Sequence, residues 1–121
     1  MQLLAASGST TMIDLENKFE LPLELPEPWY WTSQALTEQL QKEISSKHLL
    51  YGKQAKTIAR RQDNDDVLFQ LSNNDYGYAV VHLTWSEYSH ADGKYPKTIL
   101  YKDWQDVYTN RILMDKAEFE L

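Results

Sequence analysis

The chain has 121 residues, of which 42% are hydrophobic and 25% are charged, and its formal net charge at neutral pH is −6. This length suits one globular domain with a single core. Because the sequence contains no cysteine, it excludes disulfides, thiol nucleophiles and thiolate metal sites. The acidic excess argues against general nucleic-acid binding, which depends on neutralising phosphates, and favours solubility or a basic partner.

The first residues show no targeting segment. Residues 1–12 lack the basic start and the long apolar core of a signal peptide. No later segment reaches the roughly 20 apolar residues of a membrane span, so we expect a cytoplasmic protein. The small polar residues Gly8, Ser9, Thr10 and Thr11 predict a disordered leader over residues 1–12. One α+β domain is predicted over residues 13–121.

Extended structure is predicted at the start of the domain. Apolar residues alternate with glutamate and proline over residues 19–25, which is the two-residue period of a strand. Pro22 removes a backbone donor, so this segment is an edge strand or an extended arm packed on the body. Residues 26–31 then read as a turn whose three aromatic rings anchor it to the core. A platform that stacks sugars or bases is the alternative.

A helix is predicted next, from Thr32 or Ser33, either of which can cap it, to about Ser45. Its apolar residues repeat every four positions: Leu36, Leu40 and Ile44. Such a narrow stripe suits a helix that covers one face of a sheet. Residues 56–61 are predicted to form the first strand.

The centre of the sheet is predicted to be a β-hairpin over residues 66–85. Its first strand presents three apolar side chains on one face, Val67, Phe69 and Leu71, and residues 73–77 form the turn. The core face of its second strand carries Ala79, Val81, Leu83 and Trp85. The opposite face carries Tyr78, Val80, His82 and Thr84. Because both faces are partly apolar, we expect the second face to be partly covered or to form the floor of a shallow cleft.

Residues 86–95 read as a polar loop, and residues 96–101 as another short strand. A C-terminal helix begins at Asp103, whose carboxylate can cap it, with Asp106 in its first turn. It extends to about Met114 with helical spacing of Trp104, Val107, Tyr108, Arg111 and Ile112. Residues 117–121 alternate apolar residues with glutamate, which predicts an edge strand or a frayed tail.

Two groups of residues resemble metal ligands in type. The cluster Asp63, Asn64, Asp65 and Asp66 lacks the central glycine and the final glutamate of a calcium-binding EF-hand loop, so a solvated turn is the better interpretation. The three histidines, His48, His82 and His90, do not have metal-ligand spacing on one element. We predict no metal and no cofactor.

His82 is the most distinctive residue for chemistry, because it lies mid-strand between apolar neighbours. It could act as a base or as a pH-sensitive contact, whereas a hydrogen-bonded structural histidine is the commoner case. An enzyme would use His82, Thr84, Tyr78 and Asp66 as an acid–base site over the sheet. The chain has no serine in a nucleophile elbow and no glycine-rich phosphate loop.

The stretch from Lys47 to Arg61 is basic. It holds five cations and no acid: Lys47, Lys53, Lys56, Arg60 and Arg61. With Tyr51 nearby it could bind RNA phosphates, but a solvated basic face that balances the acidic remainder is favoured.

The hairpin resembles a group of small uncharacterised bacterial proteins. The resemblance lies in Asp-Asp-Val-Leu-Phe at residues 65–69, in Tyr-Ala-Val-Val-His-Leu-Thr-Trp at residues 78–85 and in Tyr95-Pro96. It extends upstream to Leu40, Glu43, His48, Leu50 and the run Ile-Ala-Arg-Arg at residues 58–61. It covers residues 36–104 and implies no particular activity. The loop at residues 87–94 is longer here than in that group.

Together these patterns predict an α+β fold: an antiparallel meander of three or four strands with an N-terminal and a C-terminal helix. We expect a non-enzymatic, acidic protein-interaction module of the immunity or adaptor kind that binds a basic protein. The alternatives are the enzyme built around His82 and the RNA-binding module. The edges at residues 19–25 and 117–121 could pair between subunits and give a homodimer.

Overall fold

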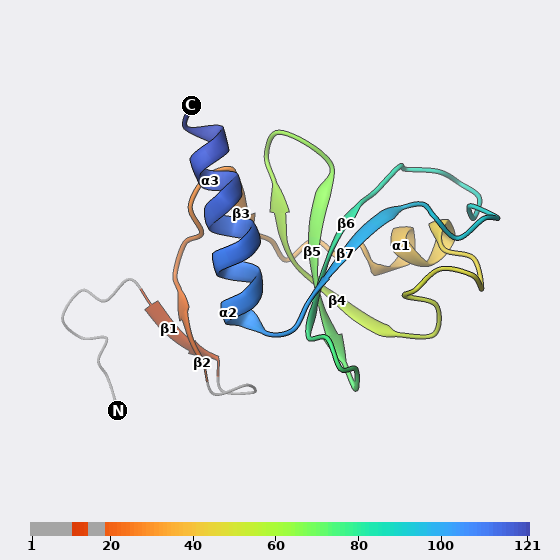
Figure 1. Cartoon of the computed structure of the whole chain (residues 1–121), viewed down its shortest axis with the longest axis horizontal. Helices are drawn as coiled ribbons and strands as arrows, with labels where there is room; N and C mark the ends of the chain where they lie inside the picture. Colours follow the sequence, from red (N-terminus) through yellow and green to blue (C-terminus); the bar gives the residue numbers. More distant parts are fainter. Residues whose placement is uncertain (1–10, 15–18) are drawn as a thin grey trace.

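The computed structural model describes residues 11–14 and 19–121. Its centre is a five-stranded sheet in the order β3-β4-β5-β6-β7, in which every neighbouring pair is antiparallel (Figure 1). The strands are β3 (Trp29–Trp31), β4 (Gln54–Arg61), β5 (Asp66–Ser72), β6 (Tyr78–His82) and β7 (Lys97–Tyr101). The α+β class and the antiparallel meander are confirmed, with five strands where three or four were predicted.

The predicted hairpin is the middle of this sheet. β5 and β6 pair with Asp66 opposite His82 and Phe69 opposite Ala79. Val67, Leu68, Phe69 and other β5 and β6 residues are fully buried, because elements cover both faces of the sheet. The hairpin therefore belongs to two separate hydrophobic clusters, one on each face.

The first face is covered by α1 (Thr37–Glu43) and the segments that flank it. Its cluster contains ten buried residues: Leu36, Leu40, Ile44, Leu50, Val67, Phe69, Leu71, Ala79, Val81 and Leu83. The predicted caps are wrong, because Leu36 is the N-cap residue and makes no side-chain cap bond. The Thr32 hydroxyl instead accepts the N–H of Gln34. α1 lies between β3 and β4, so the prediction of an N-terminal helix preceding the sheet is not supported.

The second face is covered by the C-terminal helix, which stands on the opposite side of the sheet from α1 (Figure 1). It consists of α2 (Trp104–Val107), the π-helical turn η2 (Tyr108–Ile112) and α3 (Leu113–Phe119). Tyr78 and Val80 are buried beneath it, so this face is core over those residues rather than the floor of a cleft.

The start of this helix follows its sequence signal. Asp103 caps it, because the Asp103 carboxylate accepts the backbone N–H of Asp106 at 2.8 Å. Its end differs from the prediction. Residues 113–119 continue the helix, so residues 117–119 form neither the predicted edge strand nor a frayed tail, and that segment offers no strand edge for a dimer.

The turn predicted at residues 26–31 contains a strand, because Trp29 and Trp31 pair with β4. The anchoring role is confirmed for Trp29 and Trp31 but not for Tyr30, which is 41% exposed. Trp29 is 1% exposed, and Trp31 stacks on Trp104 with ring centroids 5.6 Å apart. The indole N–H of Trp31 also donates to the carbonyl of Pro22 at 3.1 Å, which ties the preceding extended segment to the sheet.

That extended segment begins with β2 (Phe19–Pro22), which pairs with β1 (Thr11–Asp14). In Figure 1 this pair lies beyond the C-terminal helix, away from α1. The disordered leader predicted for residues 1–12 lies outside the described residues up to residue 10, whereas Thr11 and Met12 belong to β1. Among the described residues, no helix is long and apolar enough to cross a membrane.

Candidate functional site

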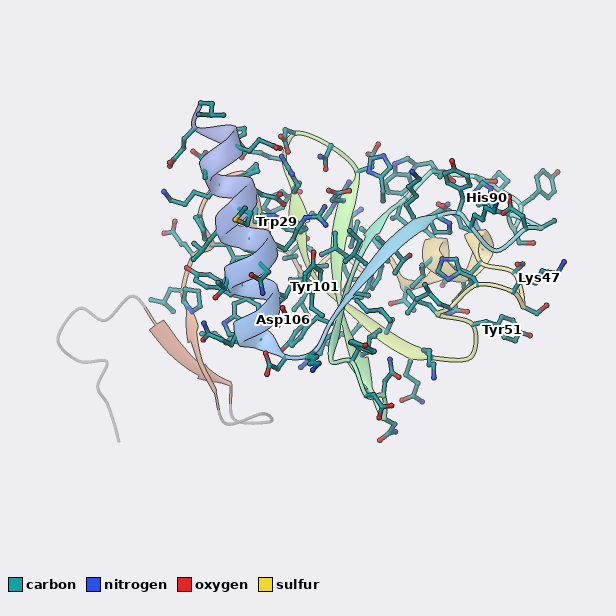
Figure 2. All side chains as sticks on the ribbon, viewed as in Figure 1. Trp29, Lys47, Tyr51, His90, Tyr101 and Asp106 are labelled. Carbon is teal, nitrogen blue, oxygen red and sulfur yellow. The ribbon has the colours of Figure 1, made fainter. Side chains whose placement is uncertain are left out.

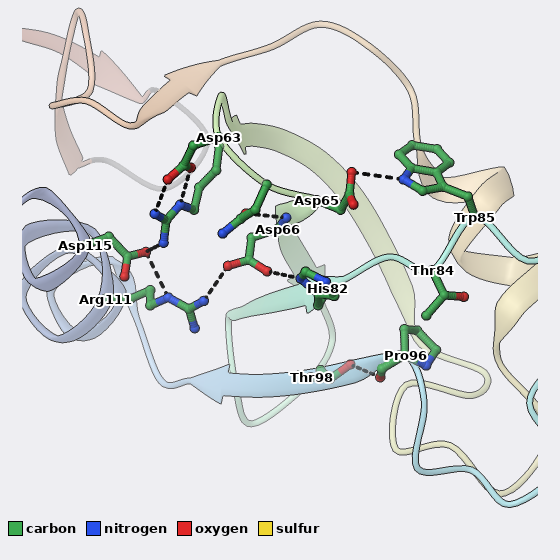
Figure 3. A network of polar contacts seen from close by, with 12 residues as sticks. Asp63, Asp65, Asp66, His82, Thr84, Trp85, Pro96, Thr98, Arg111 and Asp115 are labelled. Atoms are coloured by element: carbon green, nitrogen blue, oxygen red, sulfur yellow. Dashed lines mark hydrogen bonds and ion pairs between the residues drawn. The ribbon is translucent and has the colours of Figure 1, made fainter. Parts of the chain in front are cut away.

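A network of hydrogen bonds and ion pairs between polar side chains joins the hairpin to the C-terminal helix (Figure 3). It starts at His82, whose Nδ1 lies 2.8 Å from Oδ1 of Asp66. The second oxygen of Asp66 accepts from the Arg111 guanidinium at 2.7 Å. The side chain of His82 is 53% exposed and Asp66 is 6% exposed, so the network starts at the surface and leads into the interior.

The network continues through Asp115, whose Oδ2 accepts from Nε of Arg111 at 3.0 Å and lies 3.2 Å from Nη1 of Arg61. Arg61 in turn donates two hydrogen bonds to Asp63, at 2.8 and 2.7 Å. Burial alone would lower the pKa of Arg111, but its hydrogen bond to Tyr101 and the charge of Asp115 raise it above the ordinary value. These arginines therefore stay charged and hold the helix against the sheet.

The geometry at His82 follows from the strand register. Because Asp66 and His82 are directly opposite in the β5–β6 pair, their side chains meet on the same face. The carboxylate fixes the ring through Nδ1, and Nε2 has no hydrogen-bond partner among the described residues. An imidazole held in this way can take up a proton at Nε2, which is the arrangement of a general base.

The other two residues of the predicted acid–base site do not join it. Thr84 lies apart from His82 in Figure 3, and its hydroxyl donates to Glu43 at 2.7 Å and lies 2.9 Å from Nε2 of His90. Tyr78 is 5% exposed and packs edge-on against Trp104. The structure thus brings together His82 and Asp66 of the predicted four residues.

A second polar centre forms around Glu43, which is fully buried. Its Oε1 accepts from the backbone N–H and the hydroxyl of Thr84, at 2.9 and 2.7 Å. Its Oε2 accepts from the backbone N–H of Trp85 at 2.9 Å and from the amide of Gln39 at 2.7 Å. One carboxylate on α1 therefore fixes the backbone where the chain leaves β6.

Trp85 was predicted to lie on the core face, and this prediction is wrong. Its backbone has φ = 61°, a left-handed conformation that is costly for a bulky residue, and its side chain is 42% exposed. The chain turns away from the sheet at this point, so the strand alternation stops before Trp85. Its indole N–H donates to Asp65 at 3.0 Å, and the Arg60 guanidinium lies 5.6 Å from its ring.

The rest of the β6–β7 loop is held against the connection between α1 and β4. The backbone N–H of His90 donates to the carbonyl of Glu43 at 3.0 Å. Gly93 has φ = 76°, and a Cβ there would lie 2.6 Å from the carbonyl oxygen of Lys47, so this close approach requires glycine. His90, Lys47 and Tyr51 lie at the same end of the molecule in Figure 2.

The loop exposes large aromatic side chains. Tyr88 is 81% exposed and Tyr95 is 43% exposed, and the ammonium of Lys97 lies 5.9 Å from the Tyr95 ring. Exposed aromatic residues on a hydrogen-bonded loop are typical of surfaces that bind other proteins.

Two open cavities border the edge of the sheet formed by β3. The first has a volume of about 600 Å³ and is lined by Tyr30 and by residues 60–65. The second has a volume of about 370 Å³ and shares Tyr30 and Gln62 with the first. The first cavity also shares Arg60 and Asp65 with the surroundings of Trp85. We call the surface formed by Trp85, Asp65, Arg60, Gln62 and Tyr30 the Trp85–Tyr30 face.

The basic run is divided between the interior and the surface. Arg61 is 8% exposed and is ion-paired with Asp63 and Asp115. Arg60 donates to Gln34 at 2.9 Å and lies against Trp85. Lys47, Lys53, Lys56 and Tyr51 are exposed. An RNA surface in this region would therefore depend on three lysines and one tyrosine.

The acidic cluster at residues 63–66 is occupied by contacts within the protein. Asp63 bonds to Arg61, Asp65 to Trp85 and Asp66 to Arg111. Asn64 accepts the backbone N–H of Asp66 at 2.9 Å, as expected of an Asx turn. Within residues 11–14 and 19–121, no group of three or more histidine, aspartate or glutamate side chains could hold a metal ion.

The buried His48 has a structural role. Its Nε2 donates to the carbonyl of Pro96 at 2.9 Å, and its Nδ1 accepts the backbone N–H of Leu50 at 3.0 Å. These two bonds require the neutral ring with its proton on Nε2.

Sequence reasoning missed Glu43, although a signal for it exists. Glu43 lies seven positions after Leu36 and three after Leu40, so it belongs to the apolar stripe of α1, where a glutamate must be buried with partners. Arg111 stands in the same way within the apolar spacing of the C-terminal helix. In both helices, a charged residue on the side that faces the core indicated a buried group of polar side chains.

No family model, curated protein or solved structure that was compared with the chain matches it.

Proposed function

We propose that the protein is a non-enzymatic protein-interaction module, of the immunity or adaptor kind, that binds a basic protein partner through the Trp85–Tyr30 face. The observation that carries the proposal is the exposed Trp85 side chain, whose backbone and indole are both fixed by carboxylates, Glu43 and Asp65.

A fixed aromatic side chain is a good anchor for binding. Tryptophan and tyrosine dominate the energetics of protein interfaces, and a side chain that is already ordered loses little entropy when it binds. Glu43 holds Trp85 in a conformation that it would not adopt by preference, with φ = 61°. Holding a strained residue at the surface is a feature of functional sites.

The preference for a basic partner rests on charge. The protein carries a formal net charge of −6, which speeds encounter with a basic protein and disfavours acidic ones. Both arginines of this region are engaged within the protein: Arg60, which belongs to the face, by Gln34 and Trp85, and Arg61, which lies beside the face, by Asp63 and Asp115. Tyr30 and Trp85 are 41% and 42% exposed, so the face offers aromatic surface in an acidic molecule.

The test is affinity isolation from the native host with the wild-type protein and with Trp85→Gly. We expect one basic protein to be retained repeatedly by the wild type, to be lost with the variant and to be released as salt is raised. Tyr76→Ser is the matched control, because Tyr76 is a similarly exposed aromatic residue, 38%, in the β5–β6 turn. Retention of the same proteins by the wild type and by both variants would contradict the proposal.

A second candidate function is favoured by the His82–Asp66 pair. A half-exposed imidazole oriented by a buried carboxylate is the arrangement of an acid–base catalyst. This candidate predicts turnover of a small substrate that disappears in His82→Ala and is reduced in Asp66→Asn. Such turnover, unaffected by Trp85→Gly, would replace the interaction proposal with the enzymatic one.

A further inference from the structure

The cavity of about 370 Å³ beside β3 has aromatic and acidic walls. Its lining includes Tyr30 and Trp31 from β3, and Leu23, Glu24 and Glu27 from the extended segment before β3. Its volume lies near the lower end of the roughly 300–1,000 Å³ typical of ligand pockets, so it suits a group of the size of one long side chain.

The residues that line this cavity are held in place by contacts with the rest of the protein. The Trp31 indole donates to the carbonyl of Pro22, which fixes the segment that carries Leu23 and Glu24. The Trp31 ring also stacks on Trp104, with 23° between the ring planes. The cavity is thus bounded by an ordered ring and a tethered segment.

The charge in this cavity has one sign. Glu24 and Glu27 are exposed and, among the described residues, neither takes part in an ion pair. No lysine or arginine is among the residues that line the cavity. The other acidic residues near the Trp85–Tyr30 face differ from them, because Asp63 and Asp65 already have partners.

We propose that this cavity binds a lysine or arginine side chain of the partner protein. The cationic head lies between Glu24 and Glu27, and the aliphatic stem lies along Leu23 and the ring of Tyr30. Aromatic faces attract cations and their stems, and carboxylates bind them by charge-assisted hydrogen bonds. This inference rests on the proposed function, and it names the chemistry by which the basic partner is recognised.

The cavity adjoins the Trp85–Tyr30 face, since Tyr30 and Gln62 line both cavities along β3. A partner segment that contacts Trp85 can therefore continue to this cavity. The aromatic anchor at Trp85 supplies apolar contact, and the cavity selects a positive charge at a fixed distance from it.

The test uses the full chain labelled with ¹⁵N and a synthetic twelve-residue peptide of alternating arginine and glycine. We expect saturable NMR shift changes at the Trp31 indole and at the amides of Glu24, Glu27 and Tyr30. A peptide with citrulline in place of arginine keeps the shape and loses the charge. We expect its affinity to be lower than that of the arginine peptide by a factor of about ten or more.

Two variants of equal net charge complete the test. Glu24→Gln with Glu27→Gln should weaken arginine-peptide binding about three- to tenfold at low salt, because each exposed ion pair contributes modestly. Glu38→Gln with Glu118→Gln removes the same charge from exposed helix positions and should leave the affinity within about twofold.

Three outcomes would overturn the inference. They are the absence of any shift at these residues with millimolar peptide, equal binding of the citrulline peptide, and equal effects of the two double variants. The proposed function is tested separately by the partner from the native host. If that partner is lost with Trp85→Gly but is bound normally by Glu24→Gln with Glu27→Gln, the function stands and the cavity inference fails.

Discussion

The indole N–H of Trp29 donates to Oδ2 of Asp115 at 2.8 Å, across 86 positions of sequence. This bond joins the first strand of the sheet to the last helix, and the same oxygen atom receives Arg61 and Arg111. Three donors therefore converge on one buried carboxylate, which is 9% exposed.

We predict that Asp115→Ala lowers the free energy of unfolding by about 3–5 kcal/mol, because it leaves the buried Trp29 indole N–H without an acceptor and takes one carboxylate from each of the two arginines, Arg61 and Arg111. Urea unfolding followed by circular dichroism measures the loss. Glu118→Ala is the control on the exposed side of the same helix and should change stability by less than about 0.5 kcal/mol. Equal losses in the two variants would show that Asp115 does not hold the helix.

His82 and Asp66 should contribute unequally to stability although they bond to each other. Asp66→Ala leaves Arg111 without one of its two carboxylates, so we expect a loss of about 2–4 kcal/mol. His82→Ala removes a half-exposed ring, and we expect less than about 1 kcal/mol. Thermal and urea unfolding of both variants decide this. A large loss in His82→Ala would mean that the ring is structural and would weaken the enzymatic alternative.

Glu43→Gln should loosen the start of the β6–β7 loop. Each Glu43 oxygen accepts one backbone N–H and one side-chain donor, so the glutamine amide nitrogen leaves the backbone N–H of either Thr84 or Trp85 without an acceptor, whichever way the side chain is turned. We expect a loss of about 1–3 kcal/mol and faster hydrogen exchange at the amides of Thr84 and Trp85. Glu38→Gln, on the exposed side of α1, is the matched control. Unchanged exchange would contradict the role given to Glu43.

Trp85→Gly and Trp85→Ala separate backbone strain from side-chain contacts. Both variants lose the indole, but glycine adopts φ = 61° without the cost that a Cβ imposes. We therefore expect the glycine variant to be more stable than the alanine variant by about 1–2 kcal/mol. Equal stability in urea unfolding would show that the left-handed conformation is not retained without the indole.

Two aspartates, the exposed Asp63 and the partly exposed Asp106, give the protein a defined acid sensitivity. The hydrogen bonds from the Arg61 side chain lower the pKa of Asp63. The pKa of Asp106 is lowered mainly by the hydrogen bond from the backbone N–H of Lys102, and to a smaller extent by the one from the Asn110 side chain. Because the folded-state pKa lies below the unfolded value of about 3.9, the stabilisation is present above that value and is lost as the pH falls through the folded pKa.

Unfolding measured from pH 7 to pH 2.5 tests this statement. We expect the stability difference between the wild type and Asp106→Asn to be largest near pH 7 and to shrink below pH 4. A difference that stays constant over this range would show that Asp106 does not titrate differently in the two states.

The central part of the fold could be predicted because its signals are local. The alternation of β5 and β6 side chains between the two faces of the sheet, the turn at residues 63–66 and the cap at Asp103 depend on residues close in sequence, and all are present in the structure. The start of α1 and the strand at Trp29–Trp31 could not be predicted in this way, because β3 exists only through its pairing with β4.

The candidate site was partly predictable for the same reason. His82 was identified from its place in the strand, and the register that sets it opposite Asp66 follows from the hairpin turn. Its link to Arg111 depends on how the C-terminal helix crosses the sheet, which no local pattern contains. The exposure of Trp85 depends on Glu43, 42 positions earlier, which holds the turn that takes the chain away from the sheet.

The π-helical turn at Tyr108–Ile112 sets the angular phase of everything that follows it in the helix. Such a turn holds one residue more than an α-helical turn, and each α-helical residue turns the chain by about 100°. If the same residues formed a regular α-helix, with none deleted, Asp115 would be rotated around the axis by roughly the 100° of one residue, away from Trp29 and Arg61. The irregular turn is thus what aims the last carboxylate at the sheet.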